Sequence, residues 1–178
     1  MLQKNGTLDI LVRYLLLVIV ALPGLWLFYF VFTPLTVYPV TWLLDVFYGV
    51  SLVSGHIIIV NQEIPIELIA ACIAGSAYYL LLILNFSTRE IRLETRIKAI
   101  TFSFLTFLIV NILRIFFLSI IAVSGSTELF DATHKIFWYG LSTIFVVAIW
   151  FFEVKKFKIK TIPFYSDIKW MLNRIRKR

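Results

Sequence analysis

Long apolar segments separated by short charged stretches are the feature that most constrains how this chain can fold. They lie at residues 11–32, 68–86, 99–123 and 136–152. Runs of about 20 apolar residues are typical of transmembrane helices. The composition agrees, because 61% of the 178 residues are hydrophobic and 15% are charged, whereas an average soluble domain is roughly 45–50% apolar and about 25% charged. We therefore expect an all-α integral membrane protein with about four transmembrane helices.

The positions of the basic residues predict how the chain is oriented. The net charge is +7, from 17 Lys and Arg against 10 Asp and Glu. Except for Arg114 and Lys135, every basic residue lies near the N-terminus, in the segment 87–98 or in the segment 153–178. Because basic loops stay in the cytoplasm, we expect a multi-pass protein of the cell membrane with both termini inside. Basic clusters beside apolar segments also argue against nucleic acid as a partner.

Two stretches between the first and second apolar segments have separate interpretations. Residues 35–55 are apolar but carry Asp45, and a crossing here would reverse every later loop. We therefore predict an interfacial or re-entrant helix on the outer face, in addition to the four spans. From His56 to Leu68, two β-branched runs flank Asn61-Gln62, which favours a short β-hairpin at the outer surface.

A single domain is expected over residues 1–178. Its membrane core covers residues 11–152, and residues 153–178 form a basic cytoplasmic tail. Trp170 and Met171 predict that part of this tail is an amphipathic helix on the membrane surface, where basic side chains contact anionic lipid.

Polar residues in or beside the apolar segments are the candidates for function. Arg114 lies well inside the segment 99–123, where a charge costs about 2.5–3.5 kcal/mol on insertion scales. Asn111 precedes it by three residues, so both side chains share one helix face. Cys72, the only cysteine, lies near the outer end of its span, and His134 lies on the outer side just before the last span. Side chains from three spans therefore converge on one membrane face.

The chemistry of these residues suits acyl transfer. A cysteine thiolate is a nucleophile, and an imidazole can take up the thiol proton and later donate it to a leaving amine. An arginine can stabilise the oxyanion of a tetrahedral intermediate or bind a carboxylate. We predict a catalytic site of Cys72, Arg114 and His134, supported by Asn111, with neither a metal nor a cofactor.

Each of these residues also has a structural alternative. A lone cysteine in an apolar helix is often inert packing, and a histidine in an outer loop is often only solvated. Arg114 can form a structural ion pair, for which Glu128 and Asp131 are the expected partners.

The order of these features resembles that of a known family. In chain order they are a hairpin-like stretch, Ala71-Cys72 opening a span with Gly75 behind it, a basic loop, Asn111-x-x-Arg114 and His134. Over about residues 45–152 this order resembles the exosortase/archaeosortase family. Members of that family are polytopic membrane enzymes proposed to act as Cys/Arg/His transpeptidases on C-terminal sorting signals.

The resemblance implies a role for each matching residue. Cys72 matches the family nucleophile, Arg114 the arginine of the Asn-x-x-Arg motif, and His134 the histidine. The implied partners are exported proteins that end in a short motif, a hydrophobic helix and a basic cluster, together with membrane lipid. The chain departs from the family where Cys72-Ile73-Ala74-Gly75 replaces a Cys-Ser-Gly or Cys-Thr-Gly motif. This departure and the short chain favour a compact archaeal-type member.

Two other classes of function remain as alternatives. In a small transporter or channel subunit, Asn111 and Arg114 would line an ion or anion path. In a non-catalytic assembly factor, the hairpin and the basic tail would be contact surfaces, and neither Cys72 nor His134 would matter.

Overall fold

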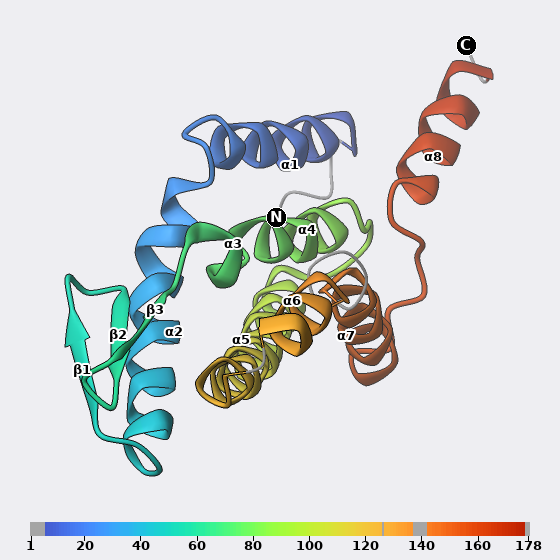
Figure 1. Cartoon of the computed structure of the whole chain (residues 1–178). Coiled ribbons are helices and arrows are strands. Elements are labelled where there is room, and N and C mark those ends of the chain that lie inside the picture. The colour runs from blue at the N-terminus through green and yellow to red at the C-terminus, as the bar shows by residue number, and fades with distance from the viewer. Residues whose placement is uncertain (1–5, 126, 137–141, 177–178) are drawn as a thin grey trace.

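The computed structural model describes residues 6–125, 127–136 and 142–176. Helices predominate, and a small antiparallel sheet lies beside them (Figure 1). In chain order the elements are α1 (Gly6–Ala21), α2 (Trp26–Asp45), β1 (Val50–Val53), β2 (Ile57–Val60), β3 (Ile64–Glu67), α3 (Ala70–Ile73), α4 (Gly75–Phe86), α5 (Leu93–Val123), α6 (Thr127–Ile136), α7 (Ser142–Lys156) and α8 (Tyr165–Arg176). The prediction of a mostly helical chain with a short hairpin is confirmed.

Residues 11–32 do not form one helix, so the predicted single helix over this segment is wrong. α1 ends at Ala21 and α2 begins at Trp26. Between them, Gly24 and Leu25 have φ angles of 63° and 62°, a left-handed conformation that a right-handed helix does not contain. The Pro-Gly pair at this point therefore breaks the helix instead of only kinking it.

A separate helix at residues 35–55 was also predicted, and this is wrong. α2 continues through Pro34 and Pro39 to Asp45, and membrane helices tolerate proline in this way. The remainder of the segment turns and enters β1. Within the described residues, α2 and α5 are the helices long and apolar enough to cross a membrane.

The sheet has the strand order β1-β2-β3. The predicted hairpin is confirmed as β2 and β3, with Ile58 opposite Ile66. Residues 61–63 connect the two strands, and Asn61 and Gln62 have φ angles of 52° and 61°, the left-handed conformation of the two central residues of a type I′ turn. β1 was not predicted; it pairs with β2, and the Asp45 carboxylate accepts a hydrogen bond from the N–H group of Val50, its first residue.

Helices also occupy the other three predicted segments, with changed boundaries. The segment 68–86 is divided into α3 and α4. The segment 99–123 lies within α5, which starts earlier and has 31 residues. Of the segment 136–152, residues 137–141 lie outside the described residues; α7 covers the rest from residue 142 and continues to Lys156.

Aromatic side chains fill the centre of the packing between α2, α4 and α5. The rings of Phe32 and Tyr78 are stacked with centroids 3.6 Å apart. Phe104 and Phe107 meet Tyr78 edge-on at 5.5 and 4.9 Å, a favoured geometry for aromatic pairs. This largely buried cluster holds α4 and α5 side by side and thereby sets the positions of the polar residues described below.

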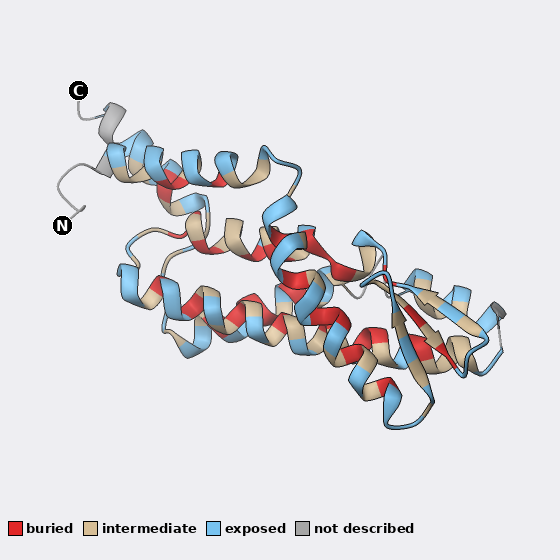
Figure 2. Ribbon diagram, turned by 90° about the vertical axis from the view of Figure 1, so that its left-hand side faces the viewer, coloured by how far each residue is buried: buried red, intermediate tan, exposed pale blue. Residues whose placement is uncertain are grey.

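Large apolar side chains also cover the outward faces of the long helices. Phe30 is 65% exposed, Ile109 58% and Phe151 67%. Exposed positions recur along the outer sides of the helices, whereas buried positions face inward (Figure 2). Monomeric soluble proteins rarely expose extended apolar patches, whereas helices that face lipid expose them as a rule.

The two ends of the helical bundle are formed by different structural elements. At one, the sheet end, the β-sheet joins α2 to α3. At the other, the loop end, the segment 87–92 meets α1 and the chain leading into α8. There the N–H group of Phe164 donates to the oxygen of Ser87 at 3.1 Å, and Arg13 donates to Asp167 at 2.8 Å. Figure 2 shows the two ends on opposite sides of the molecule.

Candidate functional site

The candidate site is built at the break between α3 and α4. Ala74 has a φ angle of 59°, so α3 stops after one turn and α4 starts at Gly75. A Cβ atom at Gly75 would lie 2.8 Å from the Tyr29 ring, which shows that α2 packs tightly against this break. Carbonyl groups at the end of a helix lack their usual partners, and Cys72 lies in this last turn.

Two side chains of α5 supply the missing donors. Asn111 Nδ2 donates to the main-chain oxygen of Cys72 at 2.9 Å, and Arg114 Nη2 donates to the same oxygen at 3.1 Å. The two donors lie three residues apart and share one face of α5. The structure therefore brings three of the predicted site residues together: Cys72, Asn111 and Arg114.

Arg114 also reaches the start of α7. Its Nη1 donates to Ser142 Oγ at 2.9 Å, so one guanidinium joins α3, α5 and α7. The expected carboxylate partners, Glu128 and Asp131, are exposed on α6, and within the described residues neither forms an ion pair with Arg114. The alternative that Arg114 forms a structural ion pair with these carboxylates is therefore wrong. Its partners are the Ser142 hydroxyl and the Cys72 carbonyl.

Two polar atoms of this junction remain unpaired. Arg114 is 8% exposed and Asn111 2%, yet Arg114 Nε and Asn111 Oδ1 have no hydrogen-bond partner in the part of the chain that the structure describes. An unpaired buried polar group costs about 1–3 kcal/mol. The junction therefore holds one unpaired donor and one unpaired acceptor, both buried, on the two side chains that contact the Cys72 carbonyl.

The Cys72 side chain has an environment different from that of its carbonyl. It is a free thiol, partly buried and packed against the apolar core. The hydrogen bonds from α5 reach its main-chain oxygen and not Sγ, but the sulfur lies within electrostatic range of Arg114. The junction thus fixes the backbone that carries the thiol.

His134 is the predicted site residue that the structure does not bring to the others. It lies near the end of α6 and is partly exposed, with its ring 5.4 Å from the ring of Phe130. No hydrogen bond among the described residues joins it to Cys72, Asn111 or Arg114. α6 packs against α5, so the imidazole is carried by an element that touches the site helix.

A second buried polar group, which sequence analysis missed, lies closer to the loop end. Glu153 of α7 is completely buried, and Asn85 Nδ2 of α4 donates to its Oε2 at 3.1 Å. Arg96 of α5 donates to the main-chain oxygens of Asn85 and Thr88. The sequence signal was the position of Glu153, directly after the last apolar segment, but such a position fits an exposed helix end equally well.

Comparisons of the chain with protein-family models, with curated proteins and with solved structures give no match. Within the described residues, no group of three or more His, Cys, Asp or Glu residues lies close enough together to hold a metal ion. The polar groups of the junction are suited to bind an amide, a carbonyl oxygen or a carboxylate.

Proposed function

We propose that the protein is a membrane-embedded cysteine transpeptidase or protease that cleaves the C-terminal sorting signals of exported proteins. Cys72 is the nucleophile, Arg114 binds the reacting carbonyl and His134 transfers protons. One observation carries the proposal: Arg114 and Asn111 fix the backbone of the only cysteine and keep an unpaired donor and acceptor beside it. The resemblance of the motif order to exosortases and archaeosortases supports the same activity.

The proposed setting is the cell membrane, which the chain crosses four times with α1–α2, α3–α4, α5 and α7. The exposed apolar faces of these helices support it. Basic residues gather at the loop end, which we place in the cytoplasm together with both termini. The sheet end then faces outside, and the junction at Cys72 lies toward this outer side.

A sorting signal fits this arrangement in one direction. Its basic cluster stays at the cytoplasmic loop end, its hydrophobic helix lies beside the enzyme in the membrane, and its motif reaches the sheet end. The scissile peptide group then meets the junction, where its oxygen accepts a hydrogen bond from Arg114 Nε and its N–H group donates to Asn111 Oδ1. Both atoms are unpaired but buried within the described residues, so the junction must open when the substrate enters.

The proposed reaction proceeds through an acyl-enzyme. The Cys72 thiolate attacks the scissile carbonyl carbon, and Arg114 stabilises the negative charge that develops on the oxygen. The C–N bond breaks as the leaving amine takes a proton from the His134 imidazolium. A thioester remains on Cys72, and an amine or water attacks it, releases the product and regenerates the thiol.

His134 must approach Cys72 for this reaction. Catalytic hydrogen bonds are often formed only in the substrate complex, and α6 is a short helix that packs against α5. The proposal therefore includes a movement of α6 that brings the imidazole to the thiol when a substrate is bound.

Processing of a co-expressed reporter tests the proposal. The reporter ends in a motif, an apolar helix and a basic cluster taken from an exported protein of the same genome. We expect Cys72→Ala, Cys72→Ser and His134→Ala to abolish processing, and mass spectrometry of the wild-type protein to detect a thioester at Cys72. The matched control is Ser76→Ala, a small polar residue four positions from Cys72, which should process normally.

Folding of each variant is checked by its melting temperature in detergent. A Cys72→Ala variant that is folded and processes the reporter at the wild-type rate contradicts the nucleophile assignment. A folded His134→Ala variant with full activity contradicts only the role of His134.

A second candidate function is favoured by one observation. Transporters bind substrates and ions at helices that are broken within the membrane, and both α1–α2 and α3–α4 are interrupted. In a transporter or channel subunit, Arg114 would matter and the Cys72 thiol would not. Loss of function in Arg114→Gln together with full function in Cys72→Ala would favour this alternative.

A further inference from the structure

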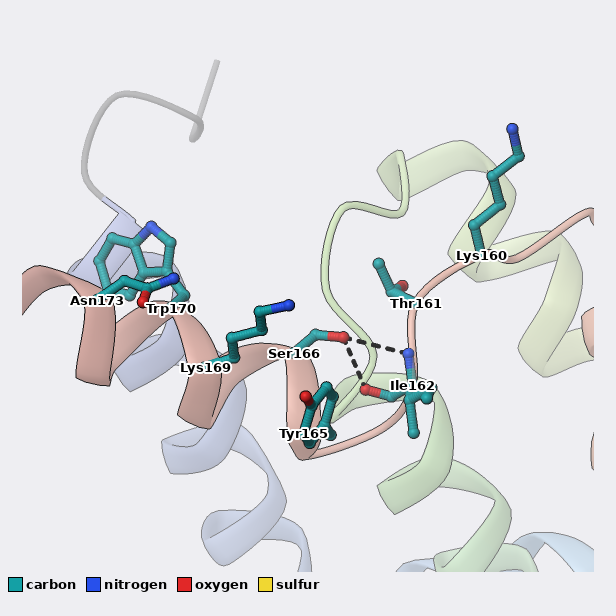
Figure 3. A pocket seen from close by; sticks show the side chains of 8 residues that line it. All are labelled: Lys160, Thr161, Ile162, Tyr165, Ser166, Lys169, Trp170 and Asn173. Carbon is teal, nitrogen blue, oxygen red and sulfur yellow. Dashed lines mark hydrogen bonds between the residues drawn. The ribbon is translucent and has the colours of Figure 1, made fainter.

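A cavity of about 310 Å³ lies at the loop end, between α8 and the chain that leads into it. Its lining includes Lys160, Ser166, Lys169 and Trp170, and none of its lining residues is acidic. Figure 3 shows Lys160 on the incoming chain and Lys169 on α8, on two sides of the cavity. A hollow that is lined by two ammonium groups and hydroxyl and amide side chains suits an anion, because no negative charge offsets the lysines.

The walls of this cavity are held in place by contacts with the rest of the protein. Ser166 Oγ donates to the oxygen of Ile162 at 2.9 Å and accepts from its N–H group at 3.1 Å. The guanidinium of Arg89 lies 4.2 Å from the centre of the Trp170 ring. Asp167, on the buried side of α8, accepts a hydrogen bond from Arg13 of α1 at 2.8 Å. The cavity is therefore part of the fold and not a feature of a loose tail.

The cavity borders an apolar surface that nothing in the described chain covers. Ile162 is 61% exposed, Ile168 56% and Leu172 61%. On α8, Ile168 and Leu172 lie four residues apart on one face, and Lys169 lies next to that face. A helix with exposed apolar residues bordered by lysines is typical of helices in the plane of a membrane interface.

Two more basic groups lie around the cavity. Arg89 is stacked on its Trp170 wall, and its Nε lies 3.9 Å from the Glu90 carboxylate, which offsets part of its charge. Lys158 lies two residues before Lys160 and is exposed. A headgroup with its own ammonium would find no carboxylate among the lining residues, so the lining favours a headgroup with net negative charge.

We propose that this cavity binds the phosphate group of an anionic phospholipid of the cytoplasmic leaflet. The phosphate oxygens accept hydrogen bonds from Lys160 and Lys169, and the acyl chains lie along Ile162, Ile168 and Leu172. The bound lipid is a structural ligand on the side of the membrane opposite to Cys72 and is not the acceptor of a transfer reaction. The inference rests on the proposed membrane setting and orientation, but not on the chemistry of Cys72.

Lipid binding to the purified full-length protein in detergent tests this inference. Native mass spectrometry and melting temperature are measured against phosphatidylglycerol, phosphatidylcholine and inorganic phosphate. We expect phosphatidylglycerol to bind the wild-type protein and raise its melting temperature. Lys160→Gln/Lys169→Gln should weaken this binding by roughly tenfold or more, since each lysine near an anionic lipid contributes about a factor of five.

Two matched variants separate a site from a general charge effect. Lys155→Gln/Arg176→Gln removes two exposed basic residues that do not line the cavity, and it should bind phosphatidylglycerol like the wild type. Lys160→Arg/Lys169→Arg keeps the charges and should restore most of the binding. Equal loss in the Lys155/Arg176 variant, or equal binding of phosphatidylcholine, would overturn the proposal.

The remaining outcomes identify other causes. Stabilisation by inorganic phosphate equal to that by phosphatidylglycerol would assign the cavity to a free phosphate and overturn the lipid assignment. Release of the protein from membranes by alkaline carbonate would refute the membrane setting itself. Neither result depends on peptide cleavage, so a failure of this inference is distinguishable from a failure of the proposed activity.

Discussion

At the scale of the residue, Arg114 combines a structural and a chemical role. Two of its nitrogens hold the ends of other helices, at Cys72 and at Ser142, and the third remains unpaired. Donating to two helices at once needs the planar guanidinium, whose N–H groups point in fixed directions. The ammonium group of a lysine is a point charge on a flexible stem and cannot do this. The charge and the geometry of this residue can therefore be tested separately.

Arg114→Lys keeps the charge but cannot reach Cys72 and Ser142 together. We expect processing of the reporter to fall by at least about tenfold, the loss typical of an oxyanion donor being on the order of a hundredfold or more. The melting temperature should fall less than in Arg114→Leu, which leaves the Cys72 and Ser142 oxygens without this donor. Full activity in the lysine variant would show that only the charge is needed.

Glu153 and Asn85 allow a similar test of a purely structural pair. Glu153→Gln keeps an acceptor for Asn85 Nδ2 and adds an N–H donor for Asn85 Oδ1, which is unpaired in the described chain. We expect its stability to equal or exceed that of the wild type. Glu153→Ala leaves Asn85 Nδ2 with only the Leu81 oxygen, and it should lose about 1–3 kcal/mol. Denaturant titration in mixed micelles measures both, with the exposed Glu94→Gln as the control.

At the scale of the element, the breaks within the apolar segments determine the site. An unbroken helix over residues 68–86 would pair the carbonyl of Cys72 within its own backbone and leave Asn111 and Arg114 without that acceptor. The left-handed residue at Ala74 frees this carbonyl and directs it toward α5. The conformation of one residue thus decides whether two buried polar side chains of another helix have a partner.

Ala74→Gly should stabilise the protein. An alanine in the left-handed region costs roughly 1–2 kcal/mol, and glycine adopts this region without that cost. We expect the melting temperature in detergent to rise. Ala74→Val should lower it, because a β-branched residue is a strong outlier there. Ala77→Gly, inside α4, is the opposite control and should be destabilising; a fall in Ala74→Gly would show that α3 and α4 form one helix in solution.

The sequence predicted the helices better than their interruptions. Apolar segments locate α4, α5 and α7, because a helix in a membrane needs a long apolar stretch and little else. Asn61-Gln62 located the hairpin because its turn chemistry is local. The breaks at Gly24 and Ala74 were missed: proline and glycine in membrane helices permit either a kink or a break, and alanine carries no signal for a left-handed angle.

Part of the candidate site could be predicted from the sequence, because it depends on local spacing along one helix. Asn111 and Arg114 share a helix face by their spacing alone, so their common partner could be anticipated. Ser142 could not be, because its contact with Arg114 depends on how α5 and α7 pack. β1 was missed because it pairs with β2, and the sequence pattern indicated only the hairpin of β2 and β3.

At the scale of the whole molecule, the sheet end and the loop end differ in charge and in architecture. The loop end gathers the basic segment 87–98, the start of α1 and the tail, whereas the sheet end carries Asp45, Glu63 and Glu67. In the proposed membrane setting, such an asymmetry favours a single orientation, because basic segments resist translocation. The proposed orientation therefore rests on the distribution of charge between the two ends.

Cysteine labelling in intact cells tests this orientation. In a Cys72→Ser background, Ser51→Cys at the sheet end and Glu94→Cys at the loop end introduce single thiols at exposed positions. We expect an impermeant maleimide to label the first and not the second, and to label both after the cells are lysed. The reverse pattern would place the loop end outside, and labelling of both in intact cells would refute a membrane-spanning arrangement.

The contact between Arg13 and Asp167 has a consequence for the order of synthesis. Arg13 and Asp167 are 154 residues apart in the sequence, so Asp167 leaves the ribosome long after Arg13. Until then, the buried guanidinium has Asp9 and the oxygen of Phe86 as partners but lacks its buried counterion. A chain that has not been translated as far as Asp167 cannot form this second ion pair, and its Arg13 guanidinium then pairs with the Asp9 carboxylate alone.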